Sequence, residues 1–255
     1  MTQAAKTLLV TGGSRGIGAA ICRLAAASGY RVAVNYVANP AAAEAVVREI
    51  ESNGGEALAI QADVAHESDI LAMFEAVDKR FGRLDALVNN AGIVDRKARV
   101  DEMDLARFER MMRINVIGTM LCAREAVKRM SLRHGGQGGA IVNISSIAAV
   151  LGSAGEYVDY AASKAAVDTF TIGLAREVAE EGIRVNAVAP NFVESPTYFP
   201  EDLLADPQKR AKIESNIPLG RLGKPEEVGE LIAFLAGADA GFMTGQVVPV
   251  AGGWA

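Results

Sequence analysis

Residues 7–18 read TLLVTGGSRGIG, a short apolar run that leads directly into a turn rich in glycine. Glycine has no Cβ atom, so the backbone can turn tightly and a phosphate can approach the first N–H groups of a following helix. The turn lacks the Lys-Ser/Thr pair of a P-loop, and its spacing is not G-x-G-x-x-G. The stretch therefore predicts a strand, a tight turn and a helix. Phosphate binding and simple chain reversal both remain open as reasons for the glycines.

Apolar, strand-like runs alternate with helix-length segments along the rest of the chain. We predict strands at residues 7–13, 31–36, 57–64, 84–92, 140–146, 183–191 and 246–253. Helical patterns lie between them, among them 40–52, 67–82 and 105–130. Strands that are apolar on both faces and separated by helices form parallel sheets covered on both sides. We expect one doubly wound, Rossmann-type α/β domain over residues 1–255, with a parallel seven-stranded sheet.

Composition narrows the classes of function. The chain has 26 basic and 31 acidic residues and a net charge of −5, which disfavours a nucleic-acid partner. No apolar run reaches membrane-spanning length and no signal-peptide pattern opens the sequence, so we expect a cytoplasmic protein without a membrane partner. Cys22 and Cys122 lack metal or redox spacing, which suits buried cysteines in a reducing compartment. His66 and His134 stand alone, and we expect both on the surface and no metal site.

The stretch EYVDYAASKAAVDTF, residues 156–170, contains two tyrosines and a lysine. In a helix, Tyr160 and Lys164 lie one turn apart on the same face, about 6 Å along the axis, whereas Tyr157 lies about 10 Å from Lys164. Free tyrosine titrates near pH 10, and a nearby ammonium group favours the phenolate and lowers that value. We therefore predict that Tyr160, and not Tyr157, exchanges protons at neutral pH.

Five motifs, in order, resemble those of the short-chain dehydrogenase/reductase family over nearly the full length. The pattern T-G-x-x-x-G-x-G matches residues 11–18 and N-N-A-G matches residues 89–92; the helix asparagine matches Asn115, the active-site serine Ser146, and Y-x-x-x-K Tyr160 and Lys164. The resemblance implies an enzyme that interconverts a carbonyl compound, such as a ketone or a 3-oxoacyl thioester, and a secondary alcohol with a nicotinamide cofactor.

The resemblance also implies roles for individual residues. Tyr160 would be the acid/base, Ser146 would hold the substrate oxygen, Lys164 would bind the nicotinamide ribose, and Asn115 would hold a water that passes protons to Lys164. The implied cofactor-binding residues are Gly12, Ser14, Arg15, Gly16, Ile17 and Gly18 in the turn, Asp63 and Val64 at the adenine, Asn90, Ala91 and Gly92 in the middle, and Pro190, Asn191 and Val193 near the nicotinamide.

The end of the second strand bears on the choice of cofactor. Enzymes that prefer NAD usually place Asp or Glu there to bind the ribose 2′-hydroxyl. This chain has Asn35 and Tyr36 instead, which we expect at that end of the cofactor. Arg15 can pair bidentately with the additional phosphate of NADP, although NAD-using relatives can carry the same arginine. We therefore expect NADP(H) to be favoured over NAD(H).

The loop after the sixth strand departs from the family pattern P-G-x-x-x-T. Asn191 replaces the glycine and Ser195 the threonine, and Asn tolerates positive φ, so the backbone path could survive. The sequence PNFVESPTYF, residues 190–199, also resembles the corresponding segment of halohydrin dehalogenases, which are cofactor-free relatives that use Ser, Tyr and Arg. The intact glycine turn and the lysine at position 164 oppose that alternative. A catalytically silent nucleotide sensor is a further alternative, opposed by the presence of Ser146, Tyr160 and Lys164.

Three further expectations concern the surroundings of the site. Ser146 and Tyr160 are fourteen residues apart where many relatives have thirteen, so an additional residue lies within 151–157, and Tyr157 is expected in the substrate wall. Prolines and aromatic residues, among them Phe192, Tyr198 and Phe199, predict a lid over the site at about residues 191–217. The resemblance implies a homotetramer built on the helices that contain residues 118–127 and 169–178.

Overall fold

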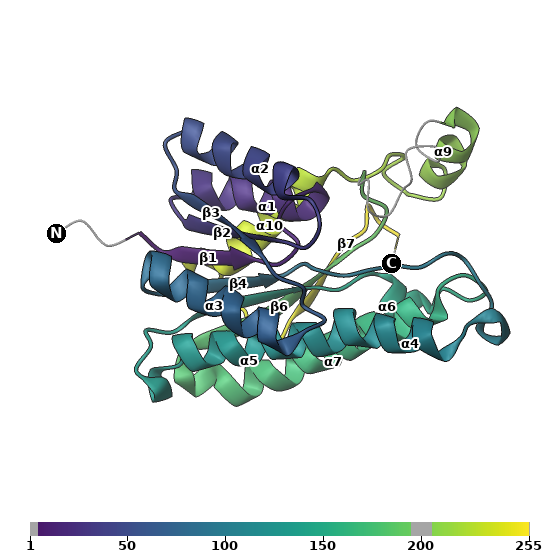
Figure 1. The fold of residues 1–255 in the computed structure, drawn as a ribbon. Coiled ribbons are helices and arrows are strands. Elements are labelled where there is room, and N and C mark those ends of the chain that lie inside the picture. The colour runs from purple at the N-terminus through teal and green to yellow at the C-terminus, as the bar shows by residue number, and fades with distance from the viewer. Residues whose placement is uncertain (1–4, 195–205, 255) are drawn as a thin grey trace.

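A computed structural model describes residues 5–194 and 206–254, and the chain forms one parallel, seven-stranded sheet with helices on both faces (Figure 1). The strand order is β3-β2-β1-β4-β5-β6-β7. The strands are β1 (Thr7–Val10), β2 (Arg31–Tyr36), β3 (Ala57–Gln61), β4 (Ala86–Asn89), β5 (Gly139–Ile144), β6 (Ile183–Pro190) and β7 (Val247–Val250). The predicted doubly wound architecture is confirmed.

Within residues 5–194 and 206–254, six helices cover the sheet. One face carries α1 (Gly16–Ala27), α2 (Pro40–Ser52) and α10 (Pro225–Ala236), and the other carries α3 (Glu67–Phe81), α5 (Thr119–Met130) and α7 (Val158–Val178). Three shorter helices, α4 (Leu105–Met112), α6 (Ala148–Leu151) and α9 (Pro207–Glu214), gather toward the end of the sheet to which the strands' carboxyl ends point (Figure 1).

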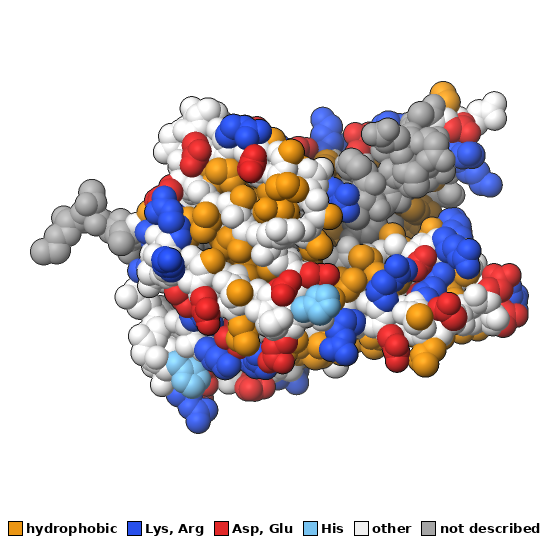
Figure 2. Space-filling model, in the orientation of Figure 1, with side chains coloured by type: hydrophobic (Ala, Val, Ile, Leu, Met, Phe, Trp, Pro, Cys, Tyr) orange, Lys and Arg blue, Asp and Glu red, His pale blue; other side chains and the backbone are white. Residues whose placement is uncertain are grey.

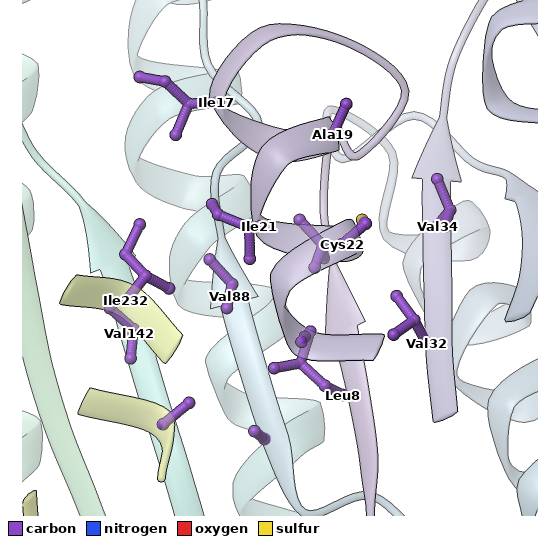
Figure 3. Close-up of a cluster of buried hydrophobic side chains, with 14 of the residues drawn as sticks. Leu8, Ile17, Ala19, Ile21, Cys22, Val32, Val34, Val88, Val142 and Ile232 are labelled. Carbon is purple, nitrogen blue, oxygen red and sulfur yellow. The ribbon is translucent and has the colours of Figure 1, made fainter. Parts of the chain in front are cut away.

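Alternation along the strands builds a core on each face. Leu8 and Val10 of β1 pack under α1, α2 and α10, whereas Leu9 faces the opposite layer. Figure 3 shows Ile21 and Cys22 of α1 above the strands, with Ile232 of α10 beside them. Because adjacent side chains point to opposite faces and both faces are covered, the strands are mostly apolar, with a few buried polar side chains such as Asn35 and Asn143.

The strand order creates a switch point beside β1. The chain winds outward from β1 to β3 and then returns to place β4 on the other side of β1. Crevices at such points, outside the carboxyl ends of the strands, are where open α/β sheets bind ligands. The glycine turn follows β1, and Asn90–Gly92 follow β4, so both lie at this crevice.

The helix predicted over residues 105–130 is interrupted. Between α4 and α5 the chain forms a π-helical segment, Arg113–Gly118, which contains Asn115. A Cβ atom on Gly118 would lie 2.7 Å from the carbonyl oxygen of Val64, so the backbone approaches its neighbour closely there. Single π turns inside helices are frequent at functional sites.

The cysteines and histidines lie where the sequence predicts. Cys22 and Cys122 are buried and free, and both histidines are exposed. Figure 2 shows Lys and Arg side chains interspersed with Asp and Glu on the face that it presents. Among residues 5–194 and 206–254, no group of His, Cys, Asp and Glu side chains is suited to hold a metal ion. None of the helices within these residues combines the length and the hydropathy needed to cross a bilayer.

Candidate active site

The glycine turn depends on its missing side chains. Gly12 and Gly16 have φ values of +63° and +51°, in the left-handed region that favours glycine. A Cβ atom on Gly18 would lie 2.2 Å from the carbonyl oxygen of Gly12, so the first turn of α1 rests directly on the loop. Arg15 is the N-cap of α1, and its side chain makes no capping hydrogen bond. The first amide groups of α1 can therefore receive an anion.

Asn35 holds the turn from the side of β2. Its side chain is fully buried, and its Oδ1 accepts a hydrogen bond from the amide of Gly12 at 3.0 Å. Its Nδ2 donates to the carbonyl oxygens of Ile60 at 3.3 Å and Ala62 at 2.9 Å. The side chain thus supports the turn from within the sheet, a role that the sequence did not reveal. A contact of Asn35 or Tyr36 with a cofactor stays a prediction.

Asn90 holds the same turn from the side of β4. Its Nδ2 donates to the carbonyl oxygens of Thr11 and Gly12, both at 2.9 Å. The hydroxyl oxygen of Thr11 in turn accepts hydrogen bonds from the amides of Asn90 and Ala91, both at 3.0 Å. The predicted motifs at residues 11–18 and 89–92 therefore form one connected structure across the switch point.

Tyr160 and Lys164 are neighbours on α7, as the spacing predicts. Lys164 Nζ lies 5.7 Å from the centroid of the Tyr160 ring, and both side chains are buried. Tyr157 is the N-cap of α7 and lies outside the helix, with Lys97 Nζ 5.8 Å from its ring centroid. Each tyrosine therefore faces a different lysine. The role of Tyr160 as the acid/base stays a prediction.

The environment of Lys164 shifts the pKa of its ammonium group. Burial lowers the pKa of the Lys164 ammonium to about 8, and the nearby carboxylate of Asp168 opposes that shift. Nζ donates a hydrogen bond to the carbonyl oxygen of Ile144 at 2.7 Å, at the end of β5. A buried amine with a pKa near neutrality, beside a tyrosine at a ligand crevice, is typical of a site that moves protons.

Asp168 is a member of this group that sequence reasoning missed. Burial raises the pKa of its carboxyl, while a hydrogen bond from Ser145 and the charge of Lys164 act in the opposite direction. Within the described part of the chain, its Oδ1 is buried and has no hydrogen-bond partner. The signal available in the sequence was its position one helical turn after Lys164.

Ser146 follows β5 at the carboxyl edge. Its Oγ accepts a hydrogen bond from the amide of Ala148 at 3.2 Å. It stands between Ile144, which binds Lys164, and Ala148, which packs against Tyr160. Between Ser146 and α7 the chain makes a left-handed turn, in which Ser153 has a φ of +47°; an additional residue in this segment stays a prediction. Ser146 therefore lies at the same edge of the sheet as the Tyr160–Lys164 pair.

Asn115 connects this group to the loop after β4. Its Oδ1 accepts a hydrogen bond from the amide of Ile93 at 2.8 Å, and its Nδ2 donates to the Ile93 carbonyl oxygen at 2.9 Å and to Ser163 Oγ at 3.1 Å. A Cβ atom on Gly92 would lie 3.3 Å from Asn115 Oδ1 and 3.4 Å from Lys164 Nζ. Gly92 therefore lies between the two side chains.

The other predicted cofactor residues lie around the same edge. Asp63 follows β3, and its Oδ1 accepts a hydrogen bond from the amide of Ala65 at 2.9 Å. Val64 is buried next to Gly118 of the π-helical segment. Ile17 is buried at the start of α1, and Ser14 is partly exposed in the turn.

The loop after β6 also reaches this edge. The Pro190 carbonyl oxygen accepts a hydrogen bond from the amide of Ile147 at 3.0 Å, and buried Val193 pairs with Gly223. Among described residues other than glycine, positive φ occurs at Ser153 alone, so the tolerance of Asn191 for that conformation is not used. Phe192 packs on Trp254, with ring centroids 5.2 Å apart.

The structure describes only part of the segment that we predict as a lid, residues 191–217. Residues 191–194 and 206–217, with α9, are described, whereas Ser195, Tyr198 and Phe199 lie outside the described residues.

The residues at this edge fit a dinucleotide. Gly18 has no space for a Cβ atom, Gly12 has a positive φ, the N-cap side chain of α1 makes no capping hydrogen bond, and Lys164 lies next to Gly92. The glycine turn at the switch point therefore lies next to the buried Tyr160–Lys164 pair, at an edge where open α/β sheets bind ligands.

Comparisons with known proteins agree with this description. The sequence model of a family described as "Enoyl-(Acyl carrier protein) reductase" matches residues 12–255. The "uncharacterized oxidoreductase YgfF" of Escherichia coli is 49% identical over 96% of this chain and 98% of its own length. A 3-oxoacyl-[acyl-carrier-protein] reductase of Synechocystis is 43% identical over 98% of this chain and 96% of its own length.

A solved structure of a short-chain dehydrogenase/reductase from Serratia marcescens superposes with a TM-score of 0.89. It is 35% identical in sequence, and the match covers 98% of this chain and 97% of that one. The chain belongs to the short-chain dehydrogenase/reductase family, and it is an oxidoreductase of that type.

Proposed function

We propose that the protein interconverts a ketone and a secondary alcohol with NADP(H), with Tyr160 as the acid/base. The observation that carries this proposal is the buried Lys164 ammonium, 5.7 Å from the Tyr160 ring centroid and next to the glycine cradle. The same arrangement supports the catalytic roles of Ser146 and Asn115 that the family resemblance implies.

The residues divide the chemistry between them. A bound nicotinamide cofactor supplies the hydride for the carbonyl carbon. Tyr160 donates its phenolic proton to the carbonyl oxygen, and the ammonium group of Lys164 stabilises the negative charge left on the tyrosine. The Ser146 hydroxyl donates a hydrogen bond to the same oxygen as charge develops on it. In alcohol oxidation, Tyr160 accepts the proton.

The substrate is proposed to be a small carbonyl compound with an apolar part. Ile93, Val94 and Tyr157 pack with Tyr160 in one apolar cluster, which suits an apolar wall at the reacting group. A relative named as a 3-oxoacyl-[acyl-carrier-protein] reductase supports the inclusion of 3-oxoacyl compounds among the candidates.

NADP(H) is proposed as the preferred cofactor. No carboxylate ends β2, the Asn35 side chain is used inside the protein, and Arg15 is exposed beside the turn. The ratio of kcat/KM with NADPH to that with NADH measures the preference. We expect Arg15→Ala and Tyr36→Asp to lower the ratio, and a wild-type preference for NADH would contradict the proposal.

The activity is tested with purified protein, NADPH and a panel of ketones and 3-oxoacyl thioesters. We expect NADPH oxidation by the wild type, loss of turnover in Tyr160→Phe and mainly a changed KM in Tyr157→Phe. Similar losses of maximal rate in the two variants would contradict the assignment. Tight NADPH binding without turnover would favour the sensor, and halide release from a haloalcohol without NADPH would favour the lyase.

The proposal extends to assembly, lid and location. Met120 of α5 and Ile172 of α7 are exposed apolar residues on the helices expected to form a homotetramer, and light scattering should give a mass near four chains.

Residues 191–217 are proposed as a lid over the site, so NADPH should slow proteolysis there. Two free, buried cysteines suit the reducing cytoplasm, which cell fractionation tests.

A further inference from the structure

A buried ion pair stands directly beside Tyr160. Arg107 Nε donates to Asp159 Oδ2 at 2.7 Å, and Arg107 Nη2 donates to Asp159 Oδ1 at 3.0 Å. The two side chains are only 8% and 2% exposed. Burial disfavours the charge on Asp159, but the guanidinium group of Arg107, together with the backbone amides of Tyr160 and Asp159, outweighs this effect and holds the pKa of the carboxyl below its usual value.

The same guanidinium group holds a third segment. Arg107 Nη1 donates to the carbonyl oxygen of Arg96 at 2.8 Å, in the loop 93–99 that follows the site end of β4. Arg107 lies in the first turn of α4, where its amide donates to the N-cap side chain of Asp104 at 2.8 Å. One side chain therefore joins α4, the start of α7 and the loop.

A second link connects the loop to the start of α7. The amide of Ala98 donates to the carbonyl oxygen of Glu156 at 3.0 Å, and Lys97 forms an ion pair with the Glu156 side chain. Ile93 and Val94, at the start of the loop, pack with Tyr160 and with Met111 of α4. The loop therefore forms one wall of the space around the tyrosine.

Stability alone does not explain this buried ion pair. Two charges removed from water lose much hydration, and a well-packed apolar pair of similar volume is often as stable or more so. The apolar pair would, however, lose the directional bonds that fix Asp159 and the Arg96 carbonyl in one arrangement. The structure therefore combines a costly buried pair with two segments that flank the reacting group.

We propose that Arg107 and Asp159 are positioning residues that fix Tyr160 relative to the loop 93–99 and so determine where the substrate carbonyl is held. The proposal rests on the proposed function, in which Tyr160 is the acid/base. Neither residue touches the reacting atoms in this account. Both act through the tyrosine and the loop.

The test compares three variants. Asp159→Asn breaks the charged pair, the double variant Arg107→Met with Asp159→Leu replaces it by apolar side chains, and Glu49→Gln weakens the exposed Arg23–Glu49 pair as a control. We expect kcat/KM for a ketone to fall at least about tenfold in the first two, with the NADPH Kd within about twofold of the wild type. We expect the control to retain wild-type kinetics.

Thermal unfolding separates positioning from stability. The double variant should unfold at or above the temperature of Asp159→Asn while its activity stays low. Recovery of kcat/KM to within about twofold of the wild type in the double variant would overturn the proposal, as would wild-type kinetics in Asp159→Asn. If Asp159→Asn fails to fold, Arg107→Lys, which keeps the charge but not the planar fork, provides the same comparison.

Hydrogen exchange tests the pair even if no substrate is turned over. In Asp159→Asn, we expect amide exchange to increase at least about tenfold in peptides from 93–99 and 156–161, and to stay unchanged in β1 and β2. Failure of wild-type turnover with this exchange pattern would count against the proposed function alone. Unchanged exchange in both segments would count against the positioning role itself.

Discussion

Replacing Asn35 with alanine should destabilise the glycine turn, which the Asn35 side chain supports from β2. The change removes the hydrogen bonds of Asn35 to the Gly12 amide and to the carbonyl oxygens of Ile60 and Ala62, all at a fully buried position. A typical protein hydrogen bond contributes about 1 kcal/mol, and buried groups left without partners cost more. We therefore expect a loss of about 3–4 kcal/mol in the free energy of unfolding, equivalent to a fall of roughly 6–16 °C in Tm.

The assay is urea unfolding followed by circular dichroism, combined with a fluorescence titration of NADPH. Asn53→Ala is the matched control, because Asn53 is exposed and its Nδ2 donates one hydrogen bond to the Glu49 carbonyl oxygen at 2.8 Å. The control should change the free energy of unfolding by no more than about 0.5 kcal/mol. A loss below about 1 kcal/mol in Asn35→Ala, or unchanged NADPH affinity, would refute the supporting role of Asn35.

Three further changes test other parts of the site. Gly18→Ala places a Cβ atom 2.2 Å from the Gly12 carbonyl oxygen, so we expect a cost of about 1–3 kcal/mol and a higher NADPH Kd; unchanged values would contradict the close packing. The pKa of Lys164 is about 8 in the folded chain, against 10.5 for an unperturbed lysine, so the unfolded chain binds more protons between these values. The wild-type free energy of unfolding should therefore gain up to about 3 kcal/mol as pH rises through that window, and urea unfolding of Lys164→Met should lack this gain. Asp168→Asn removes a carboxylate that raises the pKa of Lys164, so the alkaline limb of the kcat/KM profile should move to lower pH, and an unmoved limb would exclude that coupling.

Much of the fold could be predicted from patterns formed by residues that are close together in the sequence. The run 31–36 predicts a strand because its residues alternate between two covered faces of a parallel sheet, and β2 has those same bounds. The spacing of Tyr160 and Lys164 gave their proximity because four residues make about one helical turn. Such features depend on neighbours along the chain, which the sequence contains in full.

Features that depend on distant partners were not accessible from the sequence. Arg107 and Asp159 are 52 residues apart, and each alone looks like a charged residue on a helix surface. The sequence likewise did not reveal the π-helical segment around Asn115, in which Gly118 approaches the distant residue Val64 closely. Asn35 was placed at the cofactor by its position at a strand end, and its inward side chain follows from pairing of β2 with its neighbours.

The most direct test of the central claim follows the hydride and the proton together. The protein is incubated with a ketone and with NADPH that carries two deuterium atoms at the reactive carbon of the nicotinamide, and the product is analysed by mass spectrometry. The account predicts one deuterium on the carbinol carbon with the wild type and no product with Tyr160→Phe. Product without deuterium, or undiminished deuterium transfer by Tyr160→Phe, would contradict it.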